Sequence, residues 1–147
     1  RELVKSRFLL VILFQLAQML AAVPFALLRQ SFAIPGNAAG MDAGIALFGL
    51  ALPMLGIFNR TFLGSFFRQP TKVGTAFLKG CVGLTVCMAL AETAVFTVPF
   101  FRDCLDTPDP EHLGAKLVVL AIGAALYAAL NAIAYRNCVK TFEKVDL

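Results

Sequence analysis

The sequence predicts an all-α integral membrane protein, a helical bundle with four transmembrane helices, on three observations. First, 59% of the 147 residues are hydrophobic and only 15% are charged, whereas a typical soluble domain has roughly 45–50% and about 25%. Second, four intervals carry no charge apart from one glutamate, and each is long enough to cross a hydrocarbon layer, which takes roughly 17 to 25 helical residues. Third, none of the four has the polar stripe that a helix of a soluble protein turns toward water.

Each expected span is bounded by charged residues, because a charged side chain is costly in hydrocarbon. At a rise of about 1.5 Å per residue the intervals give helices of roughly 26 to 33 Å, close to the thickness of the hydrocarbon core. All four belong to a single domain. The spans are expected at residues 8–28, 43–59, 80–101 and 117–135, within a domain that covers residues 1–147.

The second and fourth spans contain residues that shape helix packing. Pro53 in the second span frees a backbone carbonyl, which must find a partner inside the protein. Small residues are expected to let neighbouring backbones approach closely. They are Gly44, Gly49 and Gly56 in the second span, and a stripe of Ala124, Ala128 and Ala132 in the fourth.

The segment after the second span, "RTFLGSFFRQ" (residues 60–69), is amphipathic. At 100° per residue its four large apolar side chains share one sector, with Arg60 and Arg68 on the opposite side. This pattern fits an interfacial helix that lies flat on the membrane. It fits equally well a continuation of the second span by two further turns.

The charges are distributed unevenly. The net charge is +4, and if the chain crosses four times, ten of its 13 Lys and Arg residues fall on one side. Because positive charge is retained in the cytoplasm during insertion, both ends of the chain and the middle connection are expected to be cytoplasmic. This predicts a multi-pass protein of the cytoplasmic membrane rather than a nucleic-acid-binding protein. The ten residues are Arg1, Lys5, Arg7, Arg60, Arg68, Lys72, Lys79, Arg136, Lys140 and Lys144.

No residue pattern in the chain predicts an enzyme. The GxSxG, HExxH and P-loop motifs are absent, so we expect no catalytic residue, and any ATP must be bound by another polypeptide. The four cysteines form no CxxC pair and lack the spacing of zinc ligands, and the single His112 lies in a polar loop. We therefore expect neither a metal site nor a cofactor.

Polar side chains inside the spans are the candidates for lining a substrate path: Gln15, Gln18 and Glu92. The two glutamines lie three residues apart and so are expected on one helical face. Glu92 lies near the middle of the third span, where an acidic residue costs roughly 2.5–3.5 kcal/mol to insert. It should face protein or a water-filled cavity, and the amide of Gln18 could donate to it. Glu92 could carry protons, line a substrate path or hold helices together, and the last is favoured; Asn131 is expected to make a packing hydrogen bond.

Three stretches of the chain carry a resemblance to a known family. They are "RELVKSRFLLVILFQ" at the start, "GLALPMLGIFNRTFLGSFFRQPTKVGTAFLKG" in the middle and "AYRNCVKTFEKVDL" at the end. All three resemble parts of small bacterial ABC-2 type transporter permeases. The first resembles the segment after the first cytoplasmic loop of that family, and the second its short aromatic and basic connection before a "KVG" helix start. The third resembles the terminal Y-x-x-S-V-K-x-F-E-K-V-D-L pattern. Cys138 departs from the last pattern, where serine is expected.

The resemblance implies a permease of about six spans, of which this chain would hold the last four, and the missing initiating methionine agrees with a truncated chain. It also implies two partners, a separate ATP-binding subunit and a second permease copy or homologue. In this family the loop between the second and third spans typically docks on the ATPase. The coupling candidates that follow are Arg1, Glu2, Lys5 and Arg7, with Arg60, Arg68 and Lys72 as a second contact.

The resulting hypothesis is a membrane-spanning permease subunit of an ABC-2 type exporter, which works in the lipid bilayer on ATP that another subunit hydrolyses. Such a subunit shifts between packings of rigid helices rather than making or breaking bonds. Two alternatives stay open. One is a self-sufficient, proton-coupled small transporter that uses Glu92, and the other is a non-transporting membrane scaffold or immunity protein.

Overall fold

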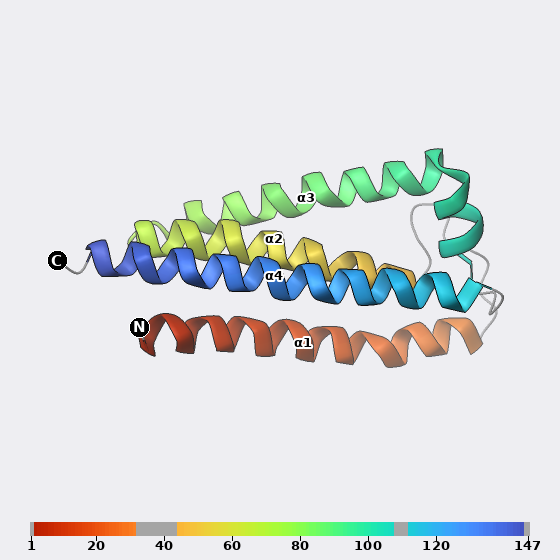
Figure 1. Ribbon diagram of the computed structural model, residues 1–147, viewed down its shortest axis with the longest axis horizontal. Helices are drawn as coiled ribbons and strands as arrows, with labels where there is room; N and C mark the ends of the chain where they lie inside the picture. The colour runs from red at the N-terminus through yellow and green to blue at the C-terminus, as the bar shows by residue number, and fades with distance from the viewer. Residues whose placement is uncertain (1, 32–43, 108–111, 146–147) are drawn as a thin grey trace.

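The computed structural model describes residues 2–31, 44–107 and 112–145, which form four long α-helices and one short π-helix (Figure 1). Each α-helix is long and apolar enough to cross a membrane. The expected all-α class with four spanning helices is therefore confirmed. The elements are α1 (Glu2–Ser31), α2 (Ile45–Arg68), α3 (Val73–Thr97), η1 (Phe101–Leu105) and α4 (Leu113–Val145).

The helices extend beyond the charge-free intervals, because Lys and Arg are good helix formers and mark the edge of the apolar segment rather than the end of the helix. α2 runs without a break to Arg68, so residues 60–69 prolong the second span and the interfacial helix is wrong. α3 instead ends early, at Thr97 rather than at residue 101. Val98 is extended, with φ −103° and ψ 114°, as the residue before a proline prefers.

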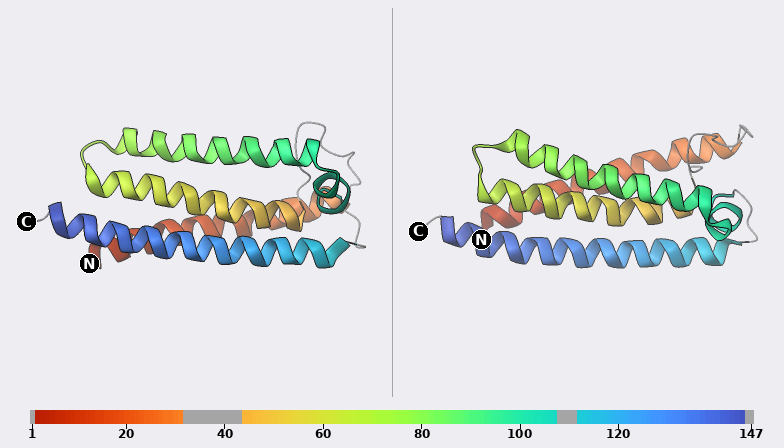
Figure 2. Two further views of the ribbon diagram at one scale, coloured as in Figure 1. Left: turned by 45° about the horizontal axis from the view of Figure 1, so that its top comes forward. Right: turned by 90° about the horizontal axis from the view of Figure 1, so that it is seen from above.

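α2 and α4 form the centre of the bundle, with α1 on one side and α3 on the other (Figure 1). α2 and α4 run in the same direction, and α1 and α3 run in the opposite one. The chain ends and the turn between α2 and α3 therefore lie at one end of the bundle, here named the basic end after the Lys and Arg residues near it. η1 runs across the opposite end (Figure 2).

α2 and α4 approach most closely at two glycines. Pro53 has no N–H, so the carbonyl of Gly49, four residues earlier, loses its helical partner. That carbonyl lies against the Cα of Gly123 on α4, where a Cα–H···O contact compensates part of the loss. A Cβ added to Gly49 would lie 2.8 Å from the backbone nitrogen of Leu120. The freed carbonyl expected from Pro53 thus has its partner inside the protein, and the two backbones leave no room for side chains.

The buried side of α2 follows a spacing of three and four residues, as in coiled coils. Small residues line its first half, and larger side chains fill the half toward the basic end. There, residues from α1, α2 and α4 form the largest core cluster: Val4, Phe8, Leu63, Phe67, Ala134 and Cys138. The residues of α2 with this spacing are Ala46, Gly49, Leu52, Gly56, Asn59, Leu63 and Phe67.

Aromatic rings attach α3 to α2. The ring of Phe77 meets those of Phe58 and Phe62 edge-on, at centroid distances of 5.9 and 6.2 Å. Gly80 gives these rings their space, since a Cβ there would lie 2.8 Å from Phe58. At the far end a smaller cluster of Ala46, Val95 and Leu105 joins α2, α3 and η1.

The outer faces of α1, α3 and α4 are apolar. On α1, for example, Leu20 and Phe25 are each 73% exposed. Exposed surface of this kind on three of the four long helices is unfavourable in water and suits a hydrocarbon solvent. The alanines of the expected stripe in α4 are also exposed, because the face that meets α2 is instead formed by Gly123, Tyr127 and Asn131.

Candidate functional site

Four polar side chains meet between α1, α2 and α4, and we call them the amide cluster: Gln15, Asn59, Tyr127 and Asn131. The amides of Gln15 and Asn59 bond reciprocally, each donating to the other over 2.8 Å. Asn59 also donates to Oδ1 of Asn131 over 2.9 Å. The hydroxyl of Tyr127 donates to Oε1 of Gln15 over 3.0 Å. All four residues are buried, and Asn59 is 0% exposed.

The amide cluster joins three helices through side chains that have hydrogen-bond partners. Asn131 donates its own amide to the carbonyl of Tyr127, one turn earlier, over 2.9 Å. The packing hydrogen bond expected of Asn131 is therefore confirmed. Interhelical hydrogen bonds in membrane proteins average about 0.6 kcal/mol each, so the four bonds between helices are worth on the order of 2–3 kcal/mol. They matter most for α1, which has few other contacts with the rest of the bundle.

The two glutamines of α1 have different environments. Gln15 is buried in the amide cluster, whereas Gln18 is exposed on the outside of the bundle. A separation of three residues turns the helix by about 300°, which leaves the two side chains roughly 60° apart. The two side chains thus lie on one broad side of α1, as expected, but the part of it that meets α2 and α4 is narrow and includes Gln15 without Gln18.

Glu92 lies on α3 and is half-buried. Its Oε2 atom is buried without a hydrogen-bond partner. No hydrogen bond joins it to Gln18, since α1 and α3 lie on opposite sides of the central pair (Figure 1). The suggested donation from Gln18 is therefore wrong. A buried carboxyl oxygen without a donor carries an uncompensated desolvation cost, so one oxygen of Glu92 is buried with its hydrogen bond unmet.

Sequence reasoning missed two members of the amide cluster. Asn59 immediately precedes Arg60 and so lies at the predicted edge of the second span, where a polar residue is ordinary. Tyr127 lies in an apolar stretch, and no pattern around it predicts a hydrogen bond. Spacing was the available signal: Tyr127 and Asn131 are four residues apart and so share a helical face. Asn59 likewise follows Gly56 by three residues and Leu52 by seven.

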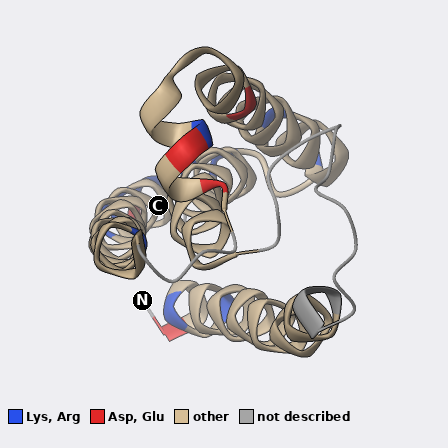
Figure 3. Ribbon diagram, turned by 90° about the vertical axis from the view of Figure 1, so that its right-hand side faces the viewer, with Lys and Arg blue, Asp and Glu red and all other residues tan. Residues whose placement is uncertain are grey.

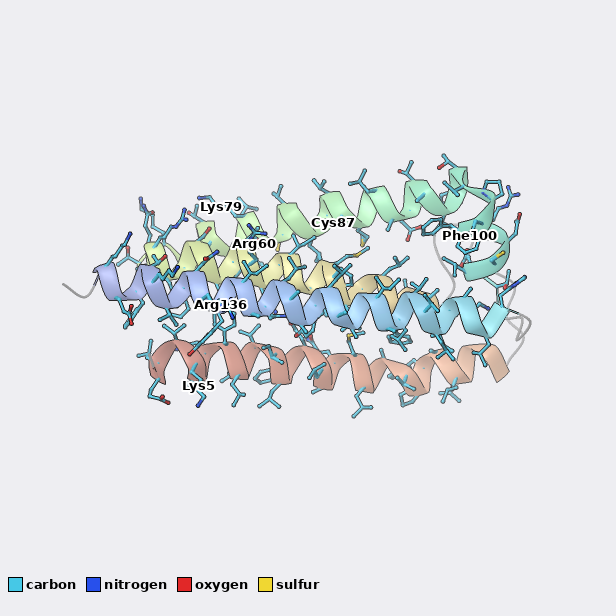
Figure 4. All side chains as sticks on the ribbon, viewed as in Figure 1. Lys5, Arg60, Lys79, Cys87, Phe100 and Arg136 are labelled. Carbon is cyan, nitrogen blue, oxygen red and sulfur yellow. The ribbon has the colours of Figure 1, made fainter. Side chains whose placement is uncertain are left out.

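The coupling candidates at the basic end are exposed to solvent. This holds for every one that the structure describes: Glu2, Lys5, Arg7, Arg60, Arg68 and Lys72. Arg1 lies outside the described residues. Figure 4 shows Lys5 and Arg60 at this end on different helices, together with Lys79 and Arg136.

The opposite end carries a different set of polar contacts. In η1, Arg102 donates to Asp103 over 2.8 Å, and this hydrogen bond lowers the pKa of the exposed Asp103 carboxyl. Lys116 at the start of α4 donates to the carbonyl of Thr107. Figure 3 looks along the bundle from this end, where charged positions of η1 face the viewer.

Within the described ranges, no group of three His, Cys, Asp or Glu side chains is placed to hold a metal ion. All four cysteines are free thiols. A largely apolar groove of about 350 Å³ runs between α1 and α4, and Asn131 lines it, whereas Gln15, Gln18 and Glu92 are not among its lining residues. Of the three substrate-path candidates, Gln15 is buried in the amide cluster, Gln18 is exposed on α1, and Glu92 lies on α3 on the other side of the central pair.

Comparison of the chain with protein-family models, with curated proteins and with solved structures gives no match.

Proposed function

We propose that the chain is a membrane-spanning permease subunit of an ABC-2 type exporter, driven by a separate ATP-binding subunit. One observation carries the proposal. The charged residues that the family resemblance assigns to coupling are exposed, and they lie at one end of four helices that can span a membrane. Positive charge concentrated there favours a cytoplasmic location. The chain ends near this face lie in the cytoplasm, where an ATPase can reach them.

The packing of α1 supports a role in which this helix moves relative to the other helices. α1 meets the other helices mainly through Val4 and Phe8 near the basic end and through the bonds of Gln15. A helix held at so few points can shift relative to the tight α2–α4 pair at modest cost. A push on the exposed charges at its start, Glu2, Lys5 and Arg7, is thereby transmitted into the membrane.

The exposed Gln18 supports a second permease copy as partner. An amide that faces hydrocarbon without a hydrogen-bond partner is unfavourable. Against a neighbouring helix it gains one. The outer face of α1 is therefore the proposed contact with a second copy or a homologue.

The proposal is tested by purifying the chain in detergent from membranes of the cells that make it. We expect an ATP-binding protein to co-purify, and the eluate to hydrolyse ATP. Arg7→Glu is expected to reduce the recovered ATPase activity by roughly tenfold or more, because a reversed charge at an interface costs several kcal/mol. Arg136→Glu, which changes an exposed charge on α4 at the same end, should retain it. Equal recovery from both variants would argue against coupling through α1, and the lack of any ATP-binding protein would favour a scaffold.

A proton-coupled transporter is the second candidate, favoured by the unpartnered carboxylate oxygen of Glu92. The two functions differ in what the chain does alone. In liposomes that contain a pH-sensitive dye, the permease subunit should pass protons no faster than empty liposomes, with or without Glu92→Gln. Proton flux through the wild type that is lost in Glu92→Gln would instead support the proton carrier.

A further inference from the structure

A cavity of about 180 Å³ lies at the basic end, between the last turn of α2 and the first turns of α3. Three cations line it, Arg68, Lys72 and Lys79, with the hydroxyls of Ser65 and Thr75 and the amide of Gln69. No acidic residue belongs to the lining. Nor does any carboxylate of the described ranges form a salt bridge with the three cations, so their charge is not neutralised there.

Backbone donors add to this positive potential. Lys72 is the N-cap of α3 but provides no side-chain cap, and the first helical bond runs from the N–H of Ala76 to the carbonyl of Lys72. The N–H groups of the first turn of α3 that precede Ala76 therefore have no acceptor within the helix. Thr75 and Ala76 of these turns line the cavity, which therefore lies beside the positive end of the helix dipole.

From this arrangement we propose that the cavity binds the phosphate of an anionic membrane lipid. A tetrahedral anion matches a cavity with three cations, two hydroxyls and free N–H groups. Exposed apolar residues on the first turns of α3, outside the cavity lining itself, favour a lipid over a free phosphate ion. Val73, Phe77 and Leu78 are 48%, 53% and 63% exposed on the same turns of α3. They offer a path along which the acyl chains of a lipid pack while its headgroup occupies the cavity.

The site does not depend on the proposed transport function. It requires only that α2 and α3 span a membrane, so that their connection lies at the level of lipid headgroups. A bound lipid there bridges α2 and α3 beside the short turn from Gln69 to Lys72 that connects them.

The test measures lipid binding to the purified chain by native mass spectrometry. Phosphatidylglycerol is compared with phosphatidylcholine of the same acyl chains, and with inorganic phosphate as competitor. We expect the wild type to prefer phosphatidylglycerol. The double variant Lys72→Gln with Lys79→Gln should weaken that binding by roughly 30-fold, since each lysine near a membrane phosphate contributes about fivefold. Phosphatidylcholine binding should not change.

The matched control removes the same charge elsewhere at the basic end. Lys140→Gln with Lys144→Gln alters two exposed lysines of α4 that do not line the cavity, and phosphatidylglycerol binding should fall by less than about threefold. Equal losses in the two double variants would overturn the proposal, because they would reveal general surface attraction. Binding of inorganic phosphate at the cavity, without a preference for phosphatidylglycerol, would also overturn it. Circular dichroism of both double variants should match that of the wild type, since the four lysines are exposed.

Discussion

Gly123→Ala is expected to destabilise the bundle by about 3 kcal/mol, because the added Cβ would overlap the carbonyl of Gly49 on α2. The clash is between backbones, so no side chain can rotate away to relieve it. The helices must separate, which also breaks the Cα–H···O contact that compensates Pro53. The free energy of unfolding, measured by titrating the purified protein from a mild into a denaturing detergent, reports the effect.

Gly64→Ala is the matched control for this prediction. It places the same methyl group on α2, at a glycine with no atom within 4 Å of the new Cβ. Alanine favours helix over glycine by about 0.5–1 kcal/mol, so Gly64→Ala should leave the protein equally or more stable. Equal stability of Gly123→Ala and Gly64→Ala would show that α2 and α4 do not cross at Gly49 and Gly123.

Asn59→Ala is expected to cost about 2–4 kcal/mol. It removes three hydrogen bonds, two with Gln15 and one with Asn131, and leaves their amides buried with fewer partners. α1 should be loosened most, since Gln15 is its polar link to the central pair. Two measurements apply: the free energy of unfolding in the same detergent titration, and the proteolysis rate of α1, which should rise.

Asn137→Ala controls for the loss of an amide from a long helix. Asn137 is exposed on α4, so the loss of its amide should change the free energy of unfolding by less than about 0.5 kcal/mol. A small effect for Asn59→Ala, comparable to that of Asn137→Ala, would contradict the amide cluster as a link between helices.

The positions of the helices could be predicted from the sequence, because each helix depends on the hydrophobicity of its own segment. Each apolar interval bounded by charge becomes a helix, and the sequence alone predicts that Pro53 frees a carbonyl and that Gly49 permits close packing. The lengths were less accurate, since Arg60 and Arg136 lie within helices that continue past the apolar interval. Charged residues mark the end of the segment that lies in hydrocarbon, whereas the end of the helix depends on backbone hydrogen bonding.

Which polar groups would meet could not be predicted from spacing alone. The pairing of Gln15 with Asn59 depends on how α1 is rotated against α2, and that rotation is set by packing of Val4 and Phe8 against residues distant in the chain. Gln18 and Glu92 looked like partners because both lie near the middle of their spans. The sequence predicts how deep in the membrane a residue lies, but it does not predict which neighbouring helix its side chain faces.

We propose a four-helix membrane bundle whose basic end faces the cytoplasm. The orientation can be measured by labelling single cysteines, in a chain with its native cysteines replaced by alanine and one new cysteine at Ser6, Asp103 or Lys144. With a thiol reagent that cannot cross membranes, we expect Asp103→Cys to be labelled in intact cells, whereas Ser6→Cys and Lys144→Cys should be labelled only after permeabilisation. Labelling of Ser6→Cys and Lys144→Cys from opposite sides of the membrane would contradict it.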